Sequence, residues 1–258
     1  MGAITIKAHT LEQALASIKQ DRYERIRAIM LHHTWIPNTA QDNGLSTVQG
    51  VQRAHMNAGA QDGILANWYS SNDGMLYNGR PLYYANWAHA AKLKSHPWDK
   101  VDPALRKLMD GDRMWCNHHC IGIETIGNFE IGRDNPKTSR SMALSLDLIA
   151  AVLKFRGLPI EKVFFHRDVD PKTCPGTAVS KAWVRDQLRA RLAGGGSSTS
   201  PLRVILLPGS QVIDCHPEVE AGVTRCDLRP VAEGLGYEVI AEHLSTQNKL
   251  YLRGGDSQ

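Results

Sequence analysis

The chain has 258 residues, of which 42% are hydrophobic and 22% are charged, the ordinary balance of a soluble globular protein. This length suits one medium domain plus a small one, or two modest domains. No apolar run approaches the ~20 residues of a membrane-spanning helix. The first 20 residues lack a basic start followed by an apolar core. We therefore expect neither stable membrane insertion nor a secretory leader.

The net charge of +4 is unevenly distributed along the chain. From Pro201 onward, five Lys or Arg stand against eight Asp or Glu, which gives −3, so the first 200 residues carry +7. A basic front half favours an anionic partner, such as nucleic acid, an acidic lipid surface or an anionic wall polymer. Because no nucleic-acid-binding motif accompanies the charge, we favour scattered surface lysines and expect no nucleic-acid partner.

Five cysteines are too few for a disulfide-built scaffold of this size. An odd count without a secretory signal indicates mostly reduced thiols, one of them available for chemistry. Cys215 and Cys226 could pair in an oxidising compartment. The five are Cys116, Cys120, Cys174, Cys215 and Cys226.

The first half of the chain alternates between helical and extended patterns. Leu11, Leu15 and Ile18 fall on one face of a predicted helix that follows Thr10 as its cap. Residues 27–34 read as a buried strand. Ser46 and Gln49 form a capping-box pattern that opens a helix ending near Asn57. Residues 64–79 predict a hairpin that turns at 72–74.

The second half continues the alternation. Residues 120–127 form a short apolar strand, and 141–159 hold the longest helix, stopped by Gly157 and Pro159. Another strand at 162–168 precedes a last helix from about Ser180 to Leu192. The fold class expected is α/β, with one mixed central sheet flanked by helices.

The stretch "AGGGSSTSP", residues 193–201, is the clearest domain boundary. Glycine and serine without apolar residues make a flexible tether. We predict a front domain over 1–193, a linker over 194–200 and a small α+β accessory module over 201–258.

Two strand ends carry residues that could hold a metal. His32 ends the first buried strand, His166 ends the strand at 162–168, and Cys174 follows His166 eight positions later. Two imidazoles and one thiolate make a good zinc set that leaves a fourth position for water. On spacing alone the structural alternative is favoured, because a histidine at a strand end usually satisfies local contacts and a lone buried cysteine behaves as a small hydrophobe.

Several motifs, in their order, resemble those of the zinc-dependent N-acetylmuramoyl-L-alanine amidases, a family that includes phage lysis enzymes and animal peptidoglycan recognition proteins. The resemblance runs from about Ile26 to Leu192, and its most specific piece is the closing His-to-Cys motif. It implies one zinc per chain bound by His32, His166 and Cys174, with Lys172 as a catalytic aid. The motifs are "MLHHT", "NDGMLYNGR", "WAHA", "NHHCIGIETIGNFE" and "FHRDVDPKTCPG".

The cluster "CNHHC", residues 116–120, is a candidate for a second metal site. In the family, an "N-x-x-S-I-G" pattern precedes the strand that bears the general base, and Asn117 fits it, with Cys120 in place of serine. In an extended segment, His118 and His119 point to opposite faces and cannot both face one ion. We therefore interpret these residues as the entrance to a strand rather than as ligands.

One departure from the family concerns the general base. Many phage members carry a catalytic tyrosine where this chain has Ala66. Other branches place a glutamate in the "IGIE" strand, so the resemblance implies Glu124 as the base. The alternative is a solvent-facing glutamate on an edge strand. We favour catalysis, because a carboxylate in an apolar strand needs a reason to be there.

The resemblance also suggests substrate contacts. His89 in "NWAHAA" matches a family histidine near the substrate cleft, and Asn67 and Trp68 on the hairpin are expected to line its wall. His33 should point away from the zinc if His32 points toward it. The segment 92–115, with a short helix near Leu105, is longer than in compact phage members.

Residues 222–239 of the tail resemble the repeat module named after the copper amine oxidase N-terminal domain. In that module a helix follows a strand pair, and its apolar face would be supplied here by Leu228, Val231, Ala232 and Leu235. The resemblance implies wall binding or spacing, not copper or oxidase chemistry. His216 and His243 are expected to be surface residues.

Together these features predict a hydrolase that cuts the amide between the lactyl group of N-acetylmuramic acid and L-alanine of the stem peptide. A phage endolysin, made in the host cytoplasm and released to the wall, is the simplest context. A bacterial autolysin or recycling enzyme, and a non-catalytic peptidoglycan-binding protein on the same fold, are the alternatives. The oligomeric state is not readable.

Overall fold

The computed structural model describes residues 4–21, 25–60, 63–88 and 97–193, together with six strands of the tail. The chain divides into two compact units, residues 1–197 and 198–258. The boundary between them falls inside the predicted linker, whose residues 194–200 lie outside the described residues.

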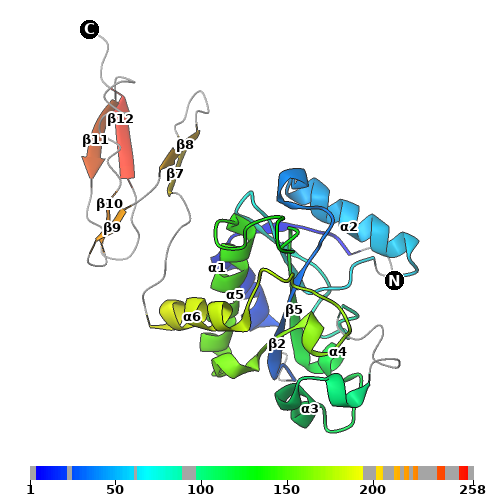
Figure 1. Cartoon of the computed structure of the whole chain (residues 1–258). Helices are drawn as coiled ribbons and strands as arrows, with labels where there is room; N and C mark the ends of the chain where they lie inside the picture. The colour runs from blue at the N-terminus through cyan, green and yellow to red at the C-terminus, as the bar shows by residue number, and fades with distance from the viewer. Residues whose placement is uncertain are drawn as a thin grey trace. The chain divides into compact units, whose positions relative to one another are not determined.

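A six-stranded mixed sheet, ordered β1-β4-β3-β5-β2-β6, forms the centre of the first unit (Figure 1). β3, β5, β2 and β6 run parallel to one another, whereas β4 pairs antiparallel with both β1 and β3. The strands are β1 (Ala8–His9), β2 (Ala28–His33), β3 (Trp68–Ser70), β4 (Leu76–Asn78), β5 (Cys120–Thr125) and β6 (Val163–Phe165). The expected mixed α/β architecture is therefore present.

Helices cover both faces of this sheet (Figure 1). α1, α5 and α6 pack on one face, and α2, α3 and α4 lie on the other. The helices are α1 (Leu11–Gln20), α2 (Leu45–Asn57), α3 (Pro103–Met109), α4 (Trp115–His119), α5 (Arg140–Arg156) and α6 (Lys181–Leu192). Short 3-10 turns cover Thr39–Gln41, Trp98–Lys100, Ile160–Lys162 and His166–Asp168.

The pleat of β2 assigns its side chains to the two faces. Ile29 and Leu31 join the large core under α1, α5 and α6, whereas Ala28 and Met30 join the cluster beside α3 and α4. Since side chains alternate along a strand, His32 emerges on the same face as Met30, the face that α2 partly covers. This alternation decides where the functional side chains point.

Local sequence signals account for several helix ends. The Thr10 side chain accepts the backbone N–H of Gln13, and the Gln13 side chain accepts that of Thr10, which completes a capping box at α1. Gly157 ends α5 in the left-handed region at φ 63°. Both predictions are confirmed.

The predicted start of α2 is wrong. Its N-cap is Gly44, and the Ser46 hydroxyl donates to the carbonyl of Asn43 instead of capping the helix. Gly44 has φ 59°, and a Cβ there would lie 2.2 Å from Oδ2 of Asp73. Close approach of the hairpin turn therefore requires glycine at this position.

Residues 115–119 are helical rather than extended. The backbone N–H groups of Asn117 and His118 both donate to the carbonyl of Met114, and β5 begins only at Cys120. The prediction of an extended strand entrance at 116–119 is wrong, because one helical turn precedes the strand. The short helix expected near Leu105 is α3.

The described residues of the second unit form three antiparallel strand pairs, β7 with β8, β9 with β10, and β11 with β12. The predicted helical face at 228–235 lies outside the described residues, as do His216, His243 and Cys226, the expected partner of Cys215. The strands are β7 (Leu202–Ile205), β8 (Val212–Cys215), β9 (Glu218–Glu220), β10 (Val223–Arg225), β11 (Tyr237–Ala241) and β12 (Leu250–Gly254).

Among the described residues, none of the helices combines the length and apolar character that a membrane crossing requires.

Truncation after Ala193 should leave a folded first unit, because the six-stranded sheet and its covering helices all precede that residue. We expect the 1–193 fragment to unfold cooperatively, with a Tm within a few degrees of the first transition of the full chain. Circular dichroism melting measures this. A fragment that precipitates or melts without a cooperative transition would show that the tail completes the core.

A candidate metal centre and its cleft

The register of the parallel strands brings three functional residues to one end of the sheet. His32 of β2 lies directly opposite Glu124 of β5. On the other side of β2, Leu31 lies opposite Phe165, the last residue of β6, so His166 follows at the same level. The carboxyl ends of β2, β5 and β6 all lie on this edge, where side chains are held firmly yet open to a cleft.

His32, His166 and Cys174 form a compact buried triad, with possible ligand atoms all within 4.8 Å of one another. Nδ1 of His32 lies 3.1 Å from Nδ1 of His166 and 3.7 Å from Sγ of Cys174. Tetrahedral zinc, with bonds of about 2.05 Å to nitrogen and 2.3 Å to sulfur, separates its ligands by roughly 3.3 Å (N to N) and 3.6 Å (N to S). The spacing and the donor types therefore fit a zinc ion.

The loop that carries Cys174 is held by Arg167. Its guanidinium donates to the carbonyls of Thr173 and Gly176 at 3.1 and 2.9 Å. The backbone N–H of Arg167 also donates to the carbonyl of Cys174. Gly176 has φ 107°, and a Cβ there would lie 2.3 Å from the carbonyl oxygen of Phe129. These contacts fix the thiol beside the two imidazoles.

Asp170 orients His166 from behind. Its carboxylate is fully buried, and Oδ2 lies 3.3 Å from Nε2 of His166 and 3.2 Å from Nζ of Lys172. Although burial raises the pKa of the Asp170 carboxyl, contact with His166 and Lys172 brings it below its usual range. Contact at Nε2 leaves Nδ1 of His166 directed at the triad, the role that carboxylates play behind metal-binding histidines.

His33 takes no part in the triad through its ring. Its Nδ1 accepts the backbone N–H of Phe129 at 3.2 Å, and the two rings stack. Burial lowers the pKa of His33 to about 4, so the ring is neutral at physiological pH. Its backbone N–H instead donates to Sγ of Cys174 at 3.4 Å. Burial raises the pKa of the Cys174 thiol, so a bound cation must displace the proton.

Glu124 faces the same cavity as the triad. Burial raises the pKa of its carboxyl to about 7, and the nearby Lys172 partly offsets this effect. Ala66, where the family often has tyrosine, is fully buried, and its neighbour Tyr69 is also fully buried, with its hydroxyl accepting the N–H of Ala66. Neither residue supplies a hydroxyl to the cavity, so Glu124 is the carboxylate available as a base there.

Two adjoining cavities form a cleft under α2. The first, about 530 Å³, contains the triad, Glu124 and Lys172. The second, about 410 Å³, lies between α2 and the segment 34–41. His55 and Glu124 line both cavities. Sizes of this order suit small-molecule and peptide ligands.

Two residues of the cleft, His55 and Trp35, and the buried Asp170 behind the triad were not predicted from the sequence. His55 lies seven residues after the buried Val48 of α2, a helical spacing that could have identified it. Trp35 lines the cavity with 57% of its surface exposed and a left-handed backbone at φ 60°. Asp170 had no signal apart from lying two residues before Lys172.

The structure does not place the predicted substrate contacts Asn67 and Trp68 in the cavity of the triad. Trp68 belongs to the core under α1 and α5, on the opposite face of the sheet from His32. Asn67 and Trp68 line a separate pocket with no residue in common with the triad cavity. The Asn67 amide donates to the carbonyl of Arg80, and its oxygen accepts the N–H of Gly122, so it joins neighbouring strands. His89 lies outside the described residues.

The "CNHHC" cluster lies apart from the triad. Cys116 and Cys120 are free and buried in the core beside α3. His119 contacts the carbonyl of Arg25 through Nδ1. Among the described residues, His32, His166 and Cys174 are the group with metal-ligand geometry.

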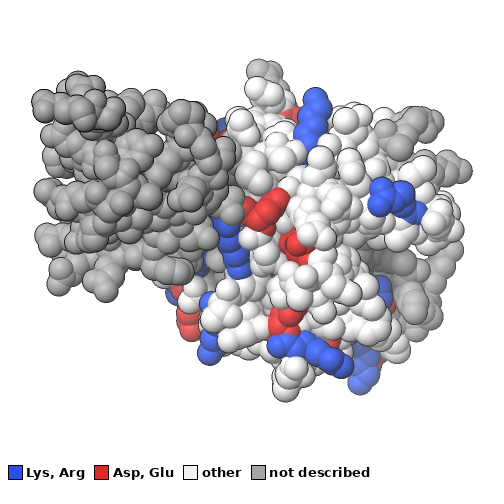
Figure 2. Space-filling view, turned by 90° about the horizontal axis from the view of Figure 1, so that it is seen from above, with Lys and Arg blue, Asp and Glu red and all other residues white. Residues whose placement is uncertain are grey.

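Charged side chains on the first unit show no concentration of one sign on the face in Figure 2. Blue Lys and Arg side chains are dispersed there among uncharged residues and a few acidic ones. On this face the distribution agrees with scattered surface lysines.

The chain matches the family model described as "N-acetylmuramoyl-L-alanine amidase" over residues 22–177, more than half of its length. The match includes His32, Glu124, His166, Lys172 and Cys174. No curated protein sequence matches the chain.

Similar solved structures come from bacteria and insects. The N-acetylmuramoyl-L-alanine amidase LysC from Clostridium intestinale is 22% identical, with a TM-score of 0.42, over 64% of this chain and 87% of that one. Drosophila PGRP-LB is 23% identical, with a TM-score of 0.41, over 58% and 75%. PGRP-SA of Apis mellifera is 19% identical, with a TM-score of 0.45, over 62% and 81%. At these identities the likeness concerns the fold alone.

Replacing Asp170 should weaken metal binding without removing a ligand. We expect Asp170→Ala to lower zinc affinity by about 10- to 100-fold, because His166 loses the carboxylate that fixes its orientation. Asp170→Asn should have a smaller effect. Competition with a chromophoric chelator measures the affinity. The matched control is Asp186→Asn, an exposed carboxylate of α6. Equal affinities for all three variants would remove Asp170 from the centre.

Glu124→Gln should stabilise the metal-free chain at alkaline pH. The carboxyl titrates at about 7 in the fold, above its usual 4.5, so the native state holds its proton more tightly than the unfolded state. Wild-type stability therefore falls as pH rises from about 4.5 to about 7, and the loss persists above that range. The glutamine variant lacks this loss. Its free energy of unfolding should therefore equal that of the wild type at pH 4 and exceed it by about 1–3 kcal/mol at pH 8.

Urea denaturation of both chains at the two pH values, with chelator present, measures the difference. An advantage that is the same at pH 4 and pH 8 would show that burial does not raise the pKa of Glu124.

Proposed function

Because the chain belongs to the N-acetylmuramoyl-L-alanine amidase family, we propose that it hydrolyses the amide between the lactyl group of N-acetylmuramic acid and L-alanine of the stem peptide. The observation that carries this proposal is the geometry of the triad beside Glu124. A metal-ligand set with ligand atoms within 4.8 Å lies in one cavity with a carboxylate and an ammonium group.

The cofactor proposed is one zinc per chain, held by His32, His166 and Cys174. The burial-lowered pKa of His166 keeps this imidazole neutral, as a ligand must be. When bound, zinc supplies a Lewis acid that polarises the amide carbonyl and makes hydroxide available near neutral pH. One cysteine and two histidines leave the fourth position open, the arrangement of catalytic rather than structural zinc sites.

Glu124 is proposed as the general base and acid. With a pKa of about 7, its carboxyl is poised to accept a proton from the attacking water and return it to the leaving amine at neutral pH. Lys172 lies in the same cavity, with its ammonium beside Asp170. It is proposed to stabilise the negative charge that develops on the carbonyl oxygen, a role suited to a fixed cationic donor.

The cleft under α2 is proposed to receive the stem peptide. His55 lies at the junction of its two cavities, and the exposed ring of Trp35 borders the triad. A bulky side chain with a left-handed backbone costs of order 1–3 kcal/mol. That cost is consistent with a ring held in place to contact substrate.

The biological setting is proposed from the sequence. A wall substrate is consistent with a phage endolysin, which acts on the wall after release from the host cytoplasm. The second unit is proposed as an accessory wall-binding or spacing module.

Two variants separate the loss of metal binding from the loss of the catalytic base. Cys174→Ser should lose zinc, because a serine hydroxyl stays protonated and binds zinc poorly. It should cut no wall peptide while its cleft walls stay in place. Glu124→Gln should keep zinc yet lose about 100- to 10,000-fold in activity, since an amide cannot accept the proton. Metal analysis and release of stem peptides from purified wall measure both effects.

Hydrolysis in ¹⁸O-labelled water identifies the bond. The proposal requires label in the lactyl carboxylate and a free α-amine on L-alanine. New sugar reducing ends, or cleavage inside the stem peptide, would contradict it. Full activity of the Cys174→Ser chain would remove this thiol from the centre.

A further inference from the structure

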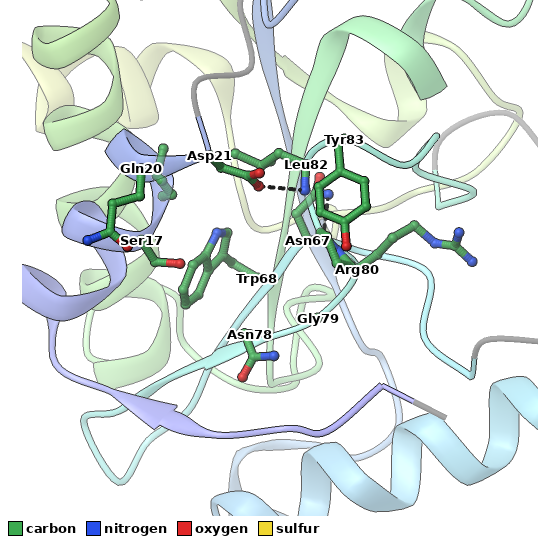
Figure 3. A pocket seen from close by; sticks show the side chains of 12 residues that line it. Ser17, Gln20, Asp21, Asn67, Trp68, Asn78, Gly79, Arg80, Leu82 and Tyr83 are labelled. Atoms are coloured by element: carbon green, nitrogen blue, oxygen red, sulfur yellow. Dashed lines mark hydrogen bonds between the residues drawn. The ribbon is translucent and has the colours of Figure 1, made fainter. Parts of the chain in front are cut away.

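A third pocket lies on the opposite face of the sheet from the triad. It has a volume of about 360 Å³ and lies between the carboxyl end of α1, the start of β3 and the segment that follows β4 (Figure 3). Trp68 faces α1 and α5, whereas His32 and Glu124 line the cleft under α2. No residue lines both this pocket and either cavity of that cleft.

Trp68 supplies the pocket with a hydrogen-bond donor. The residue is only 3% exposed, but its indole N–H is not among the described polar groups that are buried without a partner. Among the described residues it also has no protein acceptor. The indole lines the pocket, so a bound molecule can accept this N–H in place of water.

The other walls offer both acceptors and donors at short range. Ser17 and Gln20 of α1 present a hydroxyl and an amide, and both residues are exposed. Asp21 accepts the backbone N–H of Leu82 at 3.0 Å, which fixes the loop against the end of α1. Figure 3 shows the Arg80 guanidinium extending away from the indole. Asp21 and Arg80 both line the pocket, and Nε of Arg80 donates to the carbonyl of Ile64. One carboxylate and one guanidinium give the lining no net charge, which favours a neutral ligand.

An aromatic surface completes the site. Tyr83 is 55% exposed and lines the pocket, and its ring packs on Tyr84 with centroids 4.4 Å apart. This packing orders the ring before a ligand arrives. The electron-rich face of an aromatic ring attracts the polarised C–H groups of a flat, hydroxylated ring.

We propose that this pocket binds a neutral saccharide ring of the wall polymer. A sugar has an apolar C–H face for Tyr83 and hydroxyl or acetamido groups that both donate and accept hydrogen bonds. A peptide strand would need a free sheet edge, but Asn78 at the end of β4 already bonds the backbone of Thr5 and Lys7. The volume lies at the lower end of the range for small-molecule sites, roughly 300–1,000 Å³.

The identity of the sugar as a wall unit rests on the proposed function, whereas the geometry of the pocket does not. A second contact on the far face of the catalytic unit would hold the enzyme on glycan while the cleft under α2 acts on a stem peptide. Binding at two sites raises the effective concentration of substrate at the cleft.

Titration of the full chain with the trimer of N-acetylglucosamine tests the proposal, observed by NMR of methyl groups. We expect binding with a Kd on the order of 1 mM and shifts at Ile18 and Leu82, which line the pocket. Ile36 and Val51, which line the cleft under α2, should not shift. Removing zinc with a chelator should leave the binding unchanged.

Tyr83→Ala should weaken trimer binding about fivefold or more, and Tyr83→Phe should restore it, since the ring face makes the contact. The control is Trp87→Ala, an exposed aromatic outside the pocket. All three variants should release peptides from small soluble muropeptides at the wild-type rate, while Tyr83→Ala slows release from intact wall.

Four results would overturn the proposal. They are no binding at about 10 mM trimer, shifts confined to Ile36 and Val51, equal weakening by Tyr83→Ala and Trp87→Ala, and tighter binding of a sugar-free stem peptide at Ile18 and Leu82. Loss of muropeptide cleavage in the wild-type chain, with trimer binding intact, would instead count against the proposed function alone.

Discussion

Parallel pairing of β2 with β5 and β6 is the constraint on which the site depends. The register sets His32 beside Glu124 and brings His166, the first residue after β6, to the same level. A shift of one residue would turn these side chains to the face that packs against α5. Cys174 comes from a loop beyond this sheet edge, and that loop is held by the Arg167 guanidinium and by the close approach of Gly176 to Phe129.

The electrostatics of the centre favour a bound cation. Burial raises the pKa of both Glu124 and Cys174, because ionising either group inside the fold costs free energy. Asp170 is also fully buried, and Lys172 is the cationic side chain in the triad cavity. A divalent ion at the triad would offset this cost. Metal binding and stability of the first unit should therefore be coupled.

Much of the fold and the centre could be predicted from the sequence, because both rest on local signals. Thr10, Gly157 and Ser180 mark helix ends through capping chemistry that depends only on near neighbours. The spacing from His166 to Cys174, together with the family resemblance, identified a triad that the structure brings together.

What could not be predicted depends on long-range register. Trp68 and Asn67 belong to the expected hairpin. The pairing of β3 with β5 places Trp68 opposite Ile123, on the face of the sheet that packs against α1 and α5. Asp170 acts through the turn that follows His166, and its burial against Nε2 has no sequence pattern. Residues 115–119 contain a motif that suits an extended strand entrance, yet one helical turn forms there instead.

X-ray absorption at the zinc edge of the purified chain tests the central claim most directly, because it reports the atoms around the metal without reference to activity. The account predicts one zinc per chain with one sulfur at about 2.3 Å and two imidazole nitrogens at about 2.0–2.1 Å. It also predicts one further light-atom ligand at a similar distance. A shell without sulfur, a shell with two sulfurs, or a folded chain that takes up no zinc would contradict it.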